Sequence, residues 1–213
     1  MKKIFILFVS LSFMVVIARA QETDFDLRNN LTFGIKMGLN LSNVYDTKGD
    51  AFNTDPKFGY AAGGVLSLPF TKYLGLQPEF LFSQKGFLAT GNFLGGTYNL
   101  ARTSNFIDIP ILIAIKPTSQ ITVVAGPQYS YLLKQTDVFS NANISIVQQQ
   151  EFENSNIRKN VFCFLGGVDI NLHHLVLGGR VGWDITDNNG DGTSTTPRYK
   201  NVWYQATVGY RFF

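Results

Sequence analysis

Cysteine is almost absent from this chain of 213 residues, in which Cys163 stands alone. A single cysteine excludes an intrachain disulfide, so other interactions must stabilise the fold. A composition rich in the helix-forming residues Ala, Glu and Leu is also lacking, whereas Phe and Tyr are plentiful, at 19 and 9 residues. This composition favours an all-β protein whose stability depends on a hydrogen-bonded sheet.

An apolar run begins close to the N-terminus, but it falls short of the roughly 20 residues that a membrane-spanning helix needs. Lys2 and Lys3 precede this run, which covers residues 4–17, and Ala18-Arg19-Ala20 follows it. Charged, apolar and small-residue regions in this order are typical of a secretory signal peptide. We predict cleavage after Ala20, with an uncleaved anchor as the alternative.

Excess positive charge disappears once this segment is removed. The full chain has a formal net charge of +3. The predicted signal segment carries Lys2, Lys3 and Arg19 and no acidic residue, which leaves 15 basic residues against 15 acidic ones. The mature chain therefore lacks the basic excess that would indicate nucleic acid or an anionic surface as a partner.

Strict alternation of apolar with small or polar residues runs from Leu31 to Ser42. A period of two predicts a β-strand. The same alternation returns seven more times along the chain. The eight predicted strands cover residues 31–42, 58–68, 73–85, 105–115, 121–134, 161–172, 175–184 and 202–212.

The connections between these strands alternate in length. Short turns are predicted at 69–72, 116–120 and 173–174, and long polar segments at 43–57, 86–104, 135–160 and 185–201. Outer-membrane barrels of bacteria combine short periplasmic turns with longer extracellular loops. The sequence therefore predicts an all-β, eight-stranded, antiparallel up-and-down transmembrane β-barrel in the bacterial outer membrane, with both termini periplasmic.

Three segments follow from this interpretation. Residues 1–20 are predicted to be a cleaved signal peptide, residues 21–30 a periplasmic N-terminal segment, and residues 31–213 the barrel.

Charged residues share the face of the strands opposite to the apolar one. This set consists of Lys36, Glu79, Lys85, Asp108, Asp169, Arg180, Asp184 and Arg211. A dry core would bury these charges at a cost that pairing does not recover, whereas a narrow wet lumen lets them pair with one another. We expect the apolar face to contact lipid and the charged face to form a structural network in the lumen; a functional proton or ion site is the alternative.

Three prolines, Pro78, Pro110 and Pro127, fall within predicted strands. Proline cannot donate a hydrogen bond to a neighbouring strand. We therefore expect a β-bulge or a strand end near each of them.

The chain resembles the PorT-like outer-membrane β-barrel family of Bacteroidetes. The matching stretches, in order, are GIKMGLNLSN from Gly34, LQPEFLFSQKGF from Leu76, FIDIPILIAIK from Phe106, VAGPQYSYLL from Val124, LGGRVGWDITD from Leu177, and GYRFF at the end. The family pattern includes the three prolines, so the resemblance supports those strands. It implies an eight-stranded barrel in the outer membrane and little about activity.

One polar segment has the spacing of a calcium loop. Oxygen ligands would come from Asp187, Asn189 and Asp191, and a glycine occupies the sixth position. The twelfth position, where a bidentate Glu belongs, is Arg198. A plain surface loop is the alternative, because Asn-Gly and Asp-Gly pairs are ordinary turn formers.

The predicted function is that of a non-enzymatic structural, adhesion or assembly component that acts through extracellular loops. Its expected partners are outer-membrane lipid, the barrel-assembly machinery and a protein bound by loops such as 135–160; no nucleic acid, cofactor or catalytic residue is expected. The alternatives are a lipid-modifying enzyme and a narrow ion pore. His173 and His174 lie in a predicted periplasmic turn, where neither can activate a serine at the outer rim.

Overall fold

The computed structural model describes residues 26–46, 53–93, 96–141, 144–150, 158–188 and 199–212. A short 3-10 helix, η2 (Leu27–Asn29), is followed by nine strands. They are β1 (Thr32–Asp46), β2 (Asn53–Pro69), β3 (Leu74–Phe93), β4 (Gly96–Ile115), β5 (Ile121–Asn141), β6 (Ile144–Gln150), β7 (Asn160–Leu172), β8 (Leu175–Asp184) and β9 (Tyr199–Phe212). Within the described ranges, no helix has the length and apolar character needed to cross a membrane.

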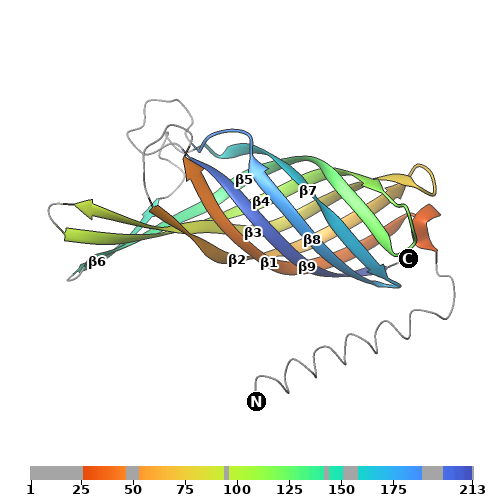
Figure 1. Ribbon diagram of the computed structural model, residues 1–213, viewed down its shortest axis with the longest axis horizontal. Helices are drawn as coiled ribbons and strands as arrows, with labels where there is room; N and C mark the ends of the chain where they lie inside the picture. The colour runs from red at the N-terminus through yellow and green to blue at the C-terminus, as the bar shows by residue number, and fades with distance from the viewer. Residues whose placement is uncertain are drawn as a thin grey trace, which may run out of the picture.

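Eight of these strands close into a ring (Figure 1). The order around the ring is β1-β2-β3-β4-β5-β7-β8-β9, and β9 pairs again with β1. Every neighbouring pair is antiparallel. This confirms the predicted eight-stranded antiparallel barrel. The ninth strand, β6, pairs with β5 alone and lies outside the ring.

The alternation along β1 sorts its side chains between the two faces of the barrel wall. Phe33 and Met37 point outward and remain 50% and 66% exposed, whereas Lys36 and Asn40 point inward and are buried. The same division continues in β4, where Ile111 and Ile113 are exposed and Asp108 is buried. A soluble barrel would bury the apolar set; here it forms the outer surface, as a lipid environment requires.

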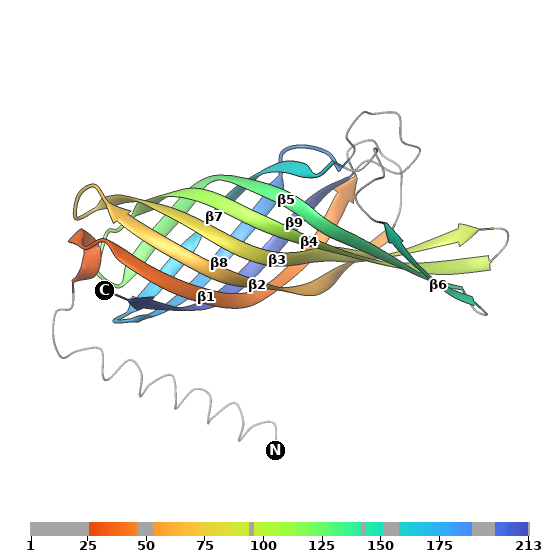
Figure 2. The ribbon, with the colours of Figure 1, turned by 180° about the vertical axis from the view of Figure 1, so that it is seen from behind.

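The two ends of the barrel differ in how their strands connect. The turns between β2 and β3, β4 and β5, and β7 and β8 lie at one end, which we call the short-turn end. At the other end, which we call the long-loop end, the β3–β4 hairpin and β6 extend beyond the rest of the barrel in both views (Figures 1 and 2). The end of β9 and η2 lie at the short-turn end.

Two segments predicted as long loops contain regular strands instead. Residues 86–104 form most of a hairpin, because β3 runs to Phe93 and β4 begins at Gly96. Residues 135–160 contain the end of β5 and all of β6. In these segments the sheet continues beyond the part of the barrel whose outer face is apolar. Neither face of the sheet carries a run of apolar residues there, so the sequence lacks the alternation that predicts a strand.

The prolines bring neither the bulge nor the strand end that was expected near each, since β3, β4 and β5 continue through Pro78, Pro110 and Pro127. The register between β3 and β4 is the same on both sides of Pro78, and that between β5 and β7 is the same on both sides of Pro127. Register shifts lie elsewhere, between Pro56 and Ala61 in β2 and between Asn105 and Phe106 in β4. Past the second shift, the side chains of β5 alternate between the two faces in the opposite frame. The alternation in the sequence predicted an inward side chain at residue 134, but residue 134 is exposed and residue 135 is buried.

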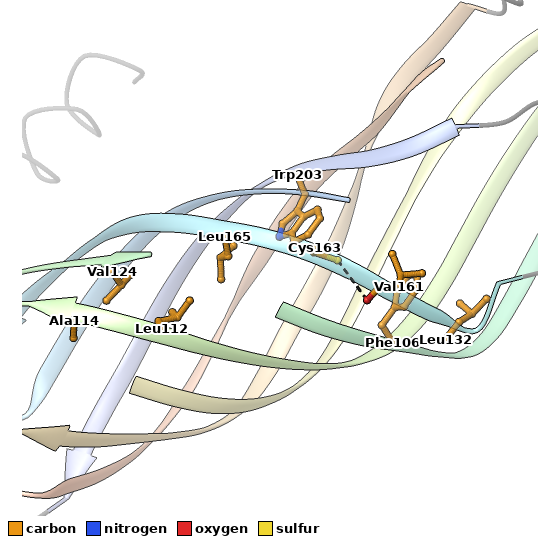
Figure 3. Packing of buried hydrophobic residues seen from close by; sticks show 9 residues of the cluster. All are labelled: Phe106, Leu112, Ala114, Val124, Leu132, Val161, Cys163, Leu165 and Trp203. Atoms are coloured by element: carbon orange, nitrogen blue, oxygen red, sulfur yellow. Dashed lines mark hydrogen bonds between the residues drawn. The ribbon is translucent and has the colours of Figure 1, made fainter. Parts of the chain in front are cut away.

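The interior is not uniformly polar, although the sequence predicted a wet, charged lumen. Nine buried residues from β4, β5, β7 and β9 form one apolar cluster (Figure 3): Phe106, Leu112, Ala114, Val124, Leu132, Val161, Cys163, Leu165 and Trp203. Trp203 is only 1% exposed. Its ring lies against Gly182 of β8, where a Cβ atom would clash with the indole and lie 2.9 Å from Leu165 Cδ1.

We predict that Gly182→Ala destabilises the barrel. The added methyl group must displace the Trp203 ring from a filled interior, and overpacking of this kind costs about 1–3 kcal/mol. Gly179→Ala in the same strand is the matched control, because a Cβ there meets no atom within 4 Å. The measurement is the free energy of unfolding in urea for barrels folded in detergent micelles. Equal stability of the two variants would contradict the packing of Trp203 against Gly182.

Candidate functional site

A group of ionic contacts crosses the barrel interior toward the short-turn end. Arg180 of β8 donates from Nη1 to Glu79 Oε1 at 2.7 Å and to Oε2 at 2.8 Å. Its Nη2 donates to the two oxygens of Asp169 at 3.2 and 3.0 Å. Lys36 donates a further, short bond to Glu79. These contacts join β1, β3, β7 and β8 through four side chains.

The same group is almost completely removed from solvent. The side chains of Arg180 and Glu79 are 1% and 0% exposed, and that of Asp169 is 3% exposed. Gln77 also donates from Nε2 to both carboxylates, to Glu79 at 3.0 Å and to Asp169 at 3.1 Å. Buried charges are tolerated where opposite charges and further hydrogen bonds satisfy them, and both conditions are met here.

A second group lies beside the apolar cluster. Lys85 pairs with Asp108, with Nζ 3.0 Å from Oδ2, and Ser83 and Ser130 both donate to the same carboxylate. The Lys85 ammonium also lies 3.8 Å from the centroid of the Trp203 ring, within the range of a cation–π interaction. Lys85 is therefore held on one side by a carboxylate and on the other by an indole.

Asp184 is linked to the second group through sulfur rather than through a cation. The Cys163 thiol donates to Asp184 Oδ1 at 3.2 Å and lies 3.4 Å from the Ser130 hydroxyl. The backbone N–H of Asn201 donates to the other carboxylate oxygen at 3.0 Å. Cys163 is buried and takes part in these contacts.

A third group near the long-loop end was missed by the sequence analysis. Arg102 and Asp137 form a bidentate pair, with both N···O distances at 2.7 Å, and Arg102 Nη1 donates to the Tyr199 hydroxyl at 2.8 Å. Both charged residues fall in segments predicted as loops. The sequence predicted no strands in these segments and therefore no register between them. For this reason it could not predict that the two residues lie opposite each other on β4 and β5.

All eight residues of the predicted lumen set lie on the inner face, but they do not form one network. Arg211 stands apart: its Nη2 donates to Asn171 Oδ1 at 2.9 Å, and no carboxylate within the described part of the chain forms an ion pair with it. The predicted set is thus divided between the first and second groups, with Arg211 outside both.

The predicted calcium loop falls largely outside the described residues. Asn189 and Asp191 are not described, and Asp187 Oδ1 lies 3.9 Å from Lys200 Nζ. In the ranges that the structure covers, no three His, Cys, Asp or Glu side chains gather as a metal site. Calcium binding by this loop stays a prediction.

The rim of the short-turn end carries an ion pair that is partly exposed to water. Arg28 donates from Nη2 to Asp26 Oδ2 at 2.7 Å, and Lys72 Nζ lies 3.2 Å from the same oxygen. The hydrogen bonds from Arg28 hold the pKa of the Asp26 carboxyl well below its usual range. This pair offers a partly exposed counterpart to the buried contacts of Arg180.

We predict that Arg180→Met lowers the free energy of unfolding by about 3–5 kcal/mol, because it leaves Glu79 and Asp169 buried without their shared cation. Arg28→Met is the control at the partly exposed pair, and loss of an ion pair that water still reaches costs about 0–1 kcal/mol. Urea unfolding in micelles measures both values. A loss for Arg180→Met no larger than that for Arg28→Met would contradict a stabilising role of the buried group.

Solved structures similar to this chain include three bacterial proteins. Ail, the attachment invasion locus protein of Yersinia pestis, superposes with a TM-score of 0.50 at 13% identity, over 85% of this chain and 99% of Ail. Neisserial surface protein A gives 0.46 at 10% identity over 84% and 97%, and OprG of Pseudomonas aeruginosa gives 0.45 at 14% over 86% and 97%. No curated protein matches the chain.

The likeness to Ail shows a shared fold and nothing finer. The sequence itself matches the family described as outer membrane protein beta-barrel domain, over residues 19–189. The match covers most of the chain, and the chain therefore belongs to the outer membrane protein beta-barrel domain family.

Proposed function

We propose that this outer-membrane barrel is a non-enzymatic structural, adhesion or assembly component that binds a partner protein at its long-loop end. The observation that carries the proposal is the sheet that projects there, formed by the β3–β4 hairpin and by β5 with β6 (Figure 2). β6 pairs with β5 along one edge, and within the described ranges no strand covers its other edge.

An open strand edge is a binding surface in its own right. Its unpaired backbone N–H and C=O groups are a template for an added strand. An extended segment of a partner can therefore continue the sheet beyond Ile144–Gln150. Such a contact requires no catalytic residue.

The proposed orientation places the long-loop end outside the cell and both termini in the periplasm. It is supported by the short turns and the end of β9 at one end of the barrel, since short turns are periplasmic in outer-membrane barrels. Residues 1–20 would be removed as a signal peptide, and 21–30 would lead into the barrel. The ordered motifs from Gly34 to the C-terminal GYRFF support a PorT-like member of the family, delivered by the barrel-assembly machinery.

The contents of the barrel favour this role over the two alternatives. The apolar cluster and the three ionic groups occupy the interior that an ion pore would need. His173 and His174 lie in the β7–β8 turn at the short-turn end, away from the outer rim where a lipid-modifying enzyme would require a base. We propose that the lumen charges are structural.

We predict that a photo-crosslinking residue at Ser145 in β6 captures one defined protein in intact cells, whereas one at Thr118 in the β4–β5 turn does not. Val147→Pro, which removes a backbone donor from β6, abolishes the capture. Labelling of Ser145→Cys and Thr118→Cys with a membrane-impermeant maleimide checks the orientation, since the native Cys163 is buried. Labelling of Thr118→Cys alone would contradict the orientation, and capture unaffected by Val147→Pro would contradict binding at the β6 edge.

A further inference from the structure

A small cavity lies inside the barrel toward the short-turn end, next to the first ionic group. Its volume is about 30 Å³, and a water molecule needs roughly 10–15 Å³ of such space. Its walls include Lys36, Asp169, Arg180, Arg211 and Thr207. The cavity therefore has room for one small ion with a water molecule, but not for a sugar or a lipid headgroup.

Positive charge exceeds negative charge around this space. Three of the lining residues are cations and Asp169 is the one lining carboxylate. Glu79, behind the wall, is already shared between Lys36 and Arg180. One positive charge, that of Arg211, is thus left without a carboxylate among the described residues.

A fourth cation adds to the excess. Lys116 donates from Nζ to Ser67 Oγ at 3.1 Å and to the Arg28 carbonyl oxygen at 3.4 Å, with no ion pair to a described carboxylate. Burial and the charge of Arg211 lower the pKa of the Lys116 ammonium. This end of the barrel is therefore electropositive, which disfavours further cations and attracts an anion.

One of the residues that line the cavity, Arg180, also has a hydrogen-bond donor to spare. Arg180 uses both terminal nitrogens on Glu79 and Asp169, and its Nε is buried with no partner among the described residues. A buried donor without an acceptor costs free energy that a bound acceptor recovers. Arg211, which also lines the cavity, is partly exposed.

From the excess charge, the spare donor and the size of the cavity, we propose that this space binds a small monovalent anion of the size of chloride, held between Arg180 and Arg211. The anion completes the charge balance of the first ionic group. It couples the stability of the short-turn end to the halide concentration of the solution that bathes it.

Bromide is the probe, because its anomalous X-ray scattering identifies it against water. Crystals of the full barrel grown in bromide are expected to show an anomalous peak in the cavity. Arg211→Gln is expected to remove the peak, and Lys134→Gln, which changes an exposed lysine of β5, is expected to retain it. Heat-modifiable migration on gels verifies that each variant is folded.

A solution measurement distinguishes a functional site from an adventitious ion only. Chloride should raise the urea unfolding midpoint above that in gluconate at the same ionic strength, with saturation. Arg211→Gln should weaken the apparent dissociation constant for chloride about ten-fold or more, as expected for one charged hydrogen bond, and Lys134→Gln should leave it unchanged. Three results would each overturn the proposal: no bromide peak in the wild type, a peak that persists in Arg211→Gln, or a peak without a saturable effect of chloride. If Arg211→Gln does not fold, the presence or absence of the peak in the wild type is the deciding result.

Discussion

Backbone hydrogen bonding around a closed ring is the constraint on which the rest of this structure depends. The hydrocarbon core of a membrane offers no water to pair with backbone groups, so a sheet can cross it only if it has no open edge. The pairing of β1 with β9, from Phe33 with Phe212 to Asp46 with Tyr199, removes the last edge. Beyond the membrane-crossing part of the barrel, water can pair with backbone groups, and there one edge of β6 pairs with no strand in the described part of the chain.

Closure with eight strands also determines what the interior holds. The barrel is narrow enough for side chains from opposite strands to meet, as those of Glu79 in β3 and Arg180 in β8 do at 2.7 Å. The apolar face contacts lipid, so the charged side chains of the opposite face must pair with one another inside the barrel. The apolar cluster around Trp203 shows that the interior is filled by packing as well as by charge.

The membrane-crossing part of this arrangement was predictable from the sequence because lipid and lumen impose opposite chemistry on alternate residues. The frame of Leu31 to Ser42 and the inward placement of Lys36 and Arg180 follow from it. Sequence reasoning failed where that contrast is absent: in the β3–β4 hairpin, in β6, and at the Arg102–Asp137 pair, which all lie toward the long-loop end.

A different failure concerns the inner apolar cluster. In the run from Ile109 to Ile115, outward isoleucines alternate with Pro110, Leu112 and Ala114, so both faces are apolar and the sequence gives no sign of an inner apolar cluster. Only the three-dimensional closure shows that Leu112 belongs to one buried cluster with Leu165 and Trp203. Pattern alone identifies the lipid face, whereas the composition of the interior requires the register of every strand.

The central claim is that the apolar face contacts lipid while the opposite face is enclosed, and the two tryptophans of the chain test it directly. Trp183 points outward and is 39% exposed, whereas Trp203 points inward and is 1% exposed. The measurement is quenching of tryptophan fluorescence by brominated lipids in two single-tryptophan variants, Trp203→Phe and Trp183→Phe. Strong quenching of Trp183 with little quenching of Trp203 is the predicted result, and equal or reversed quenching would contradict the assignment of the two faces.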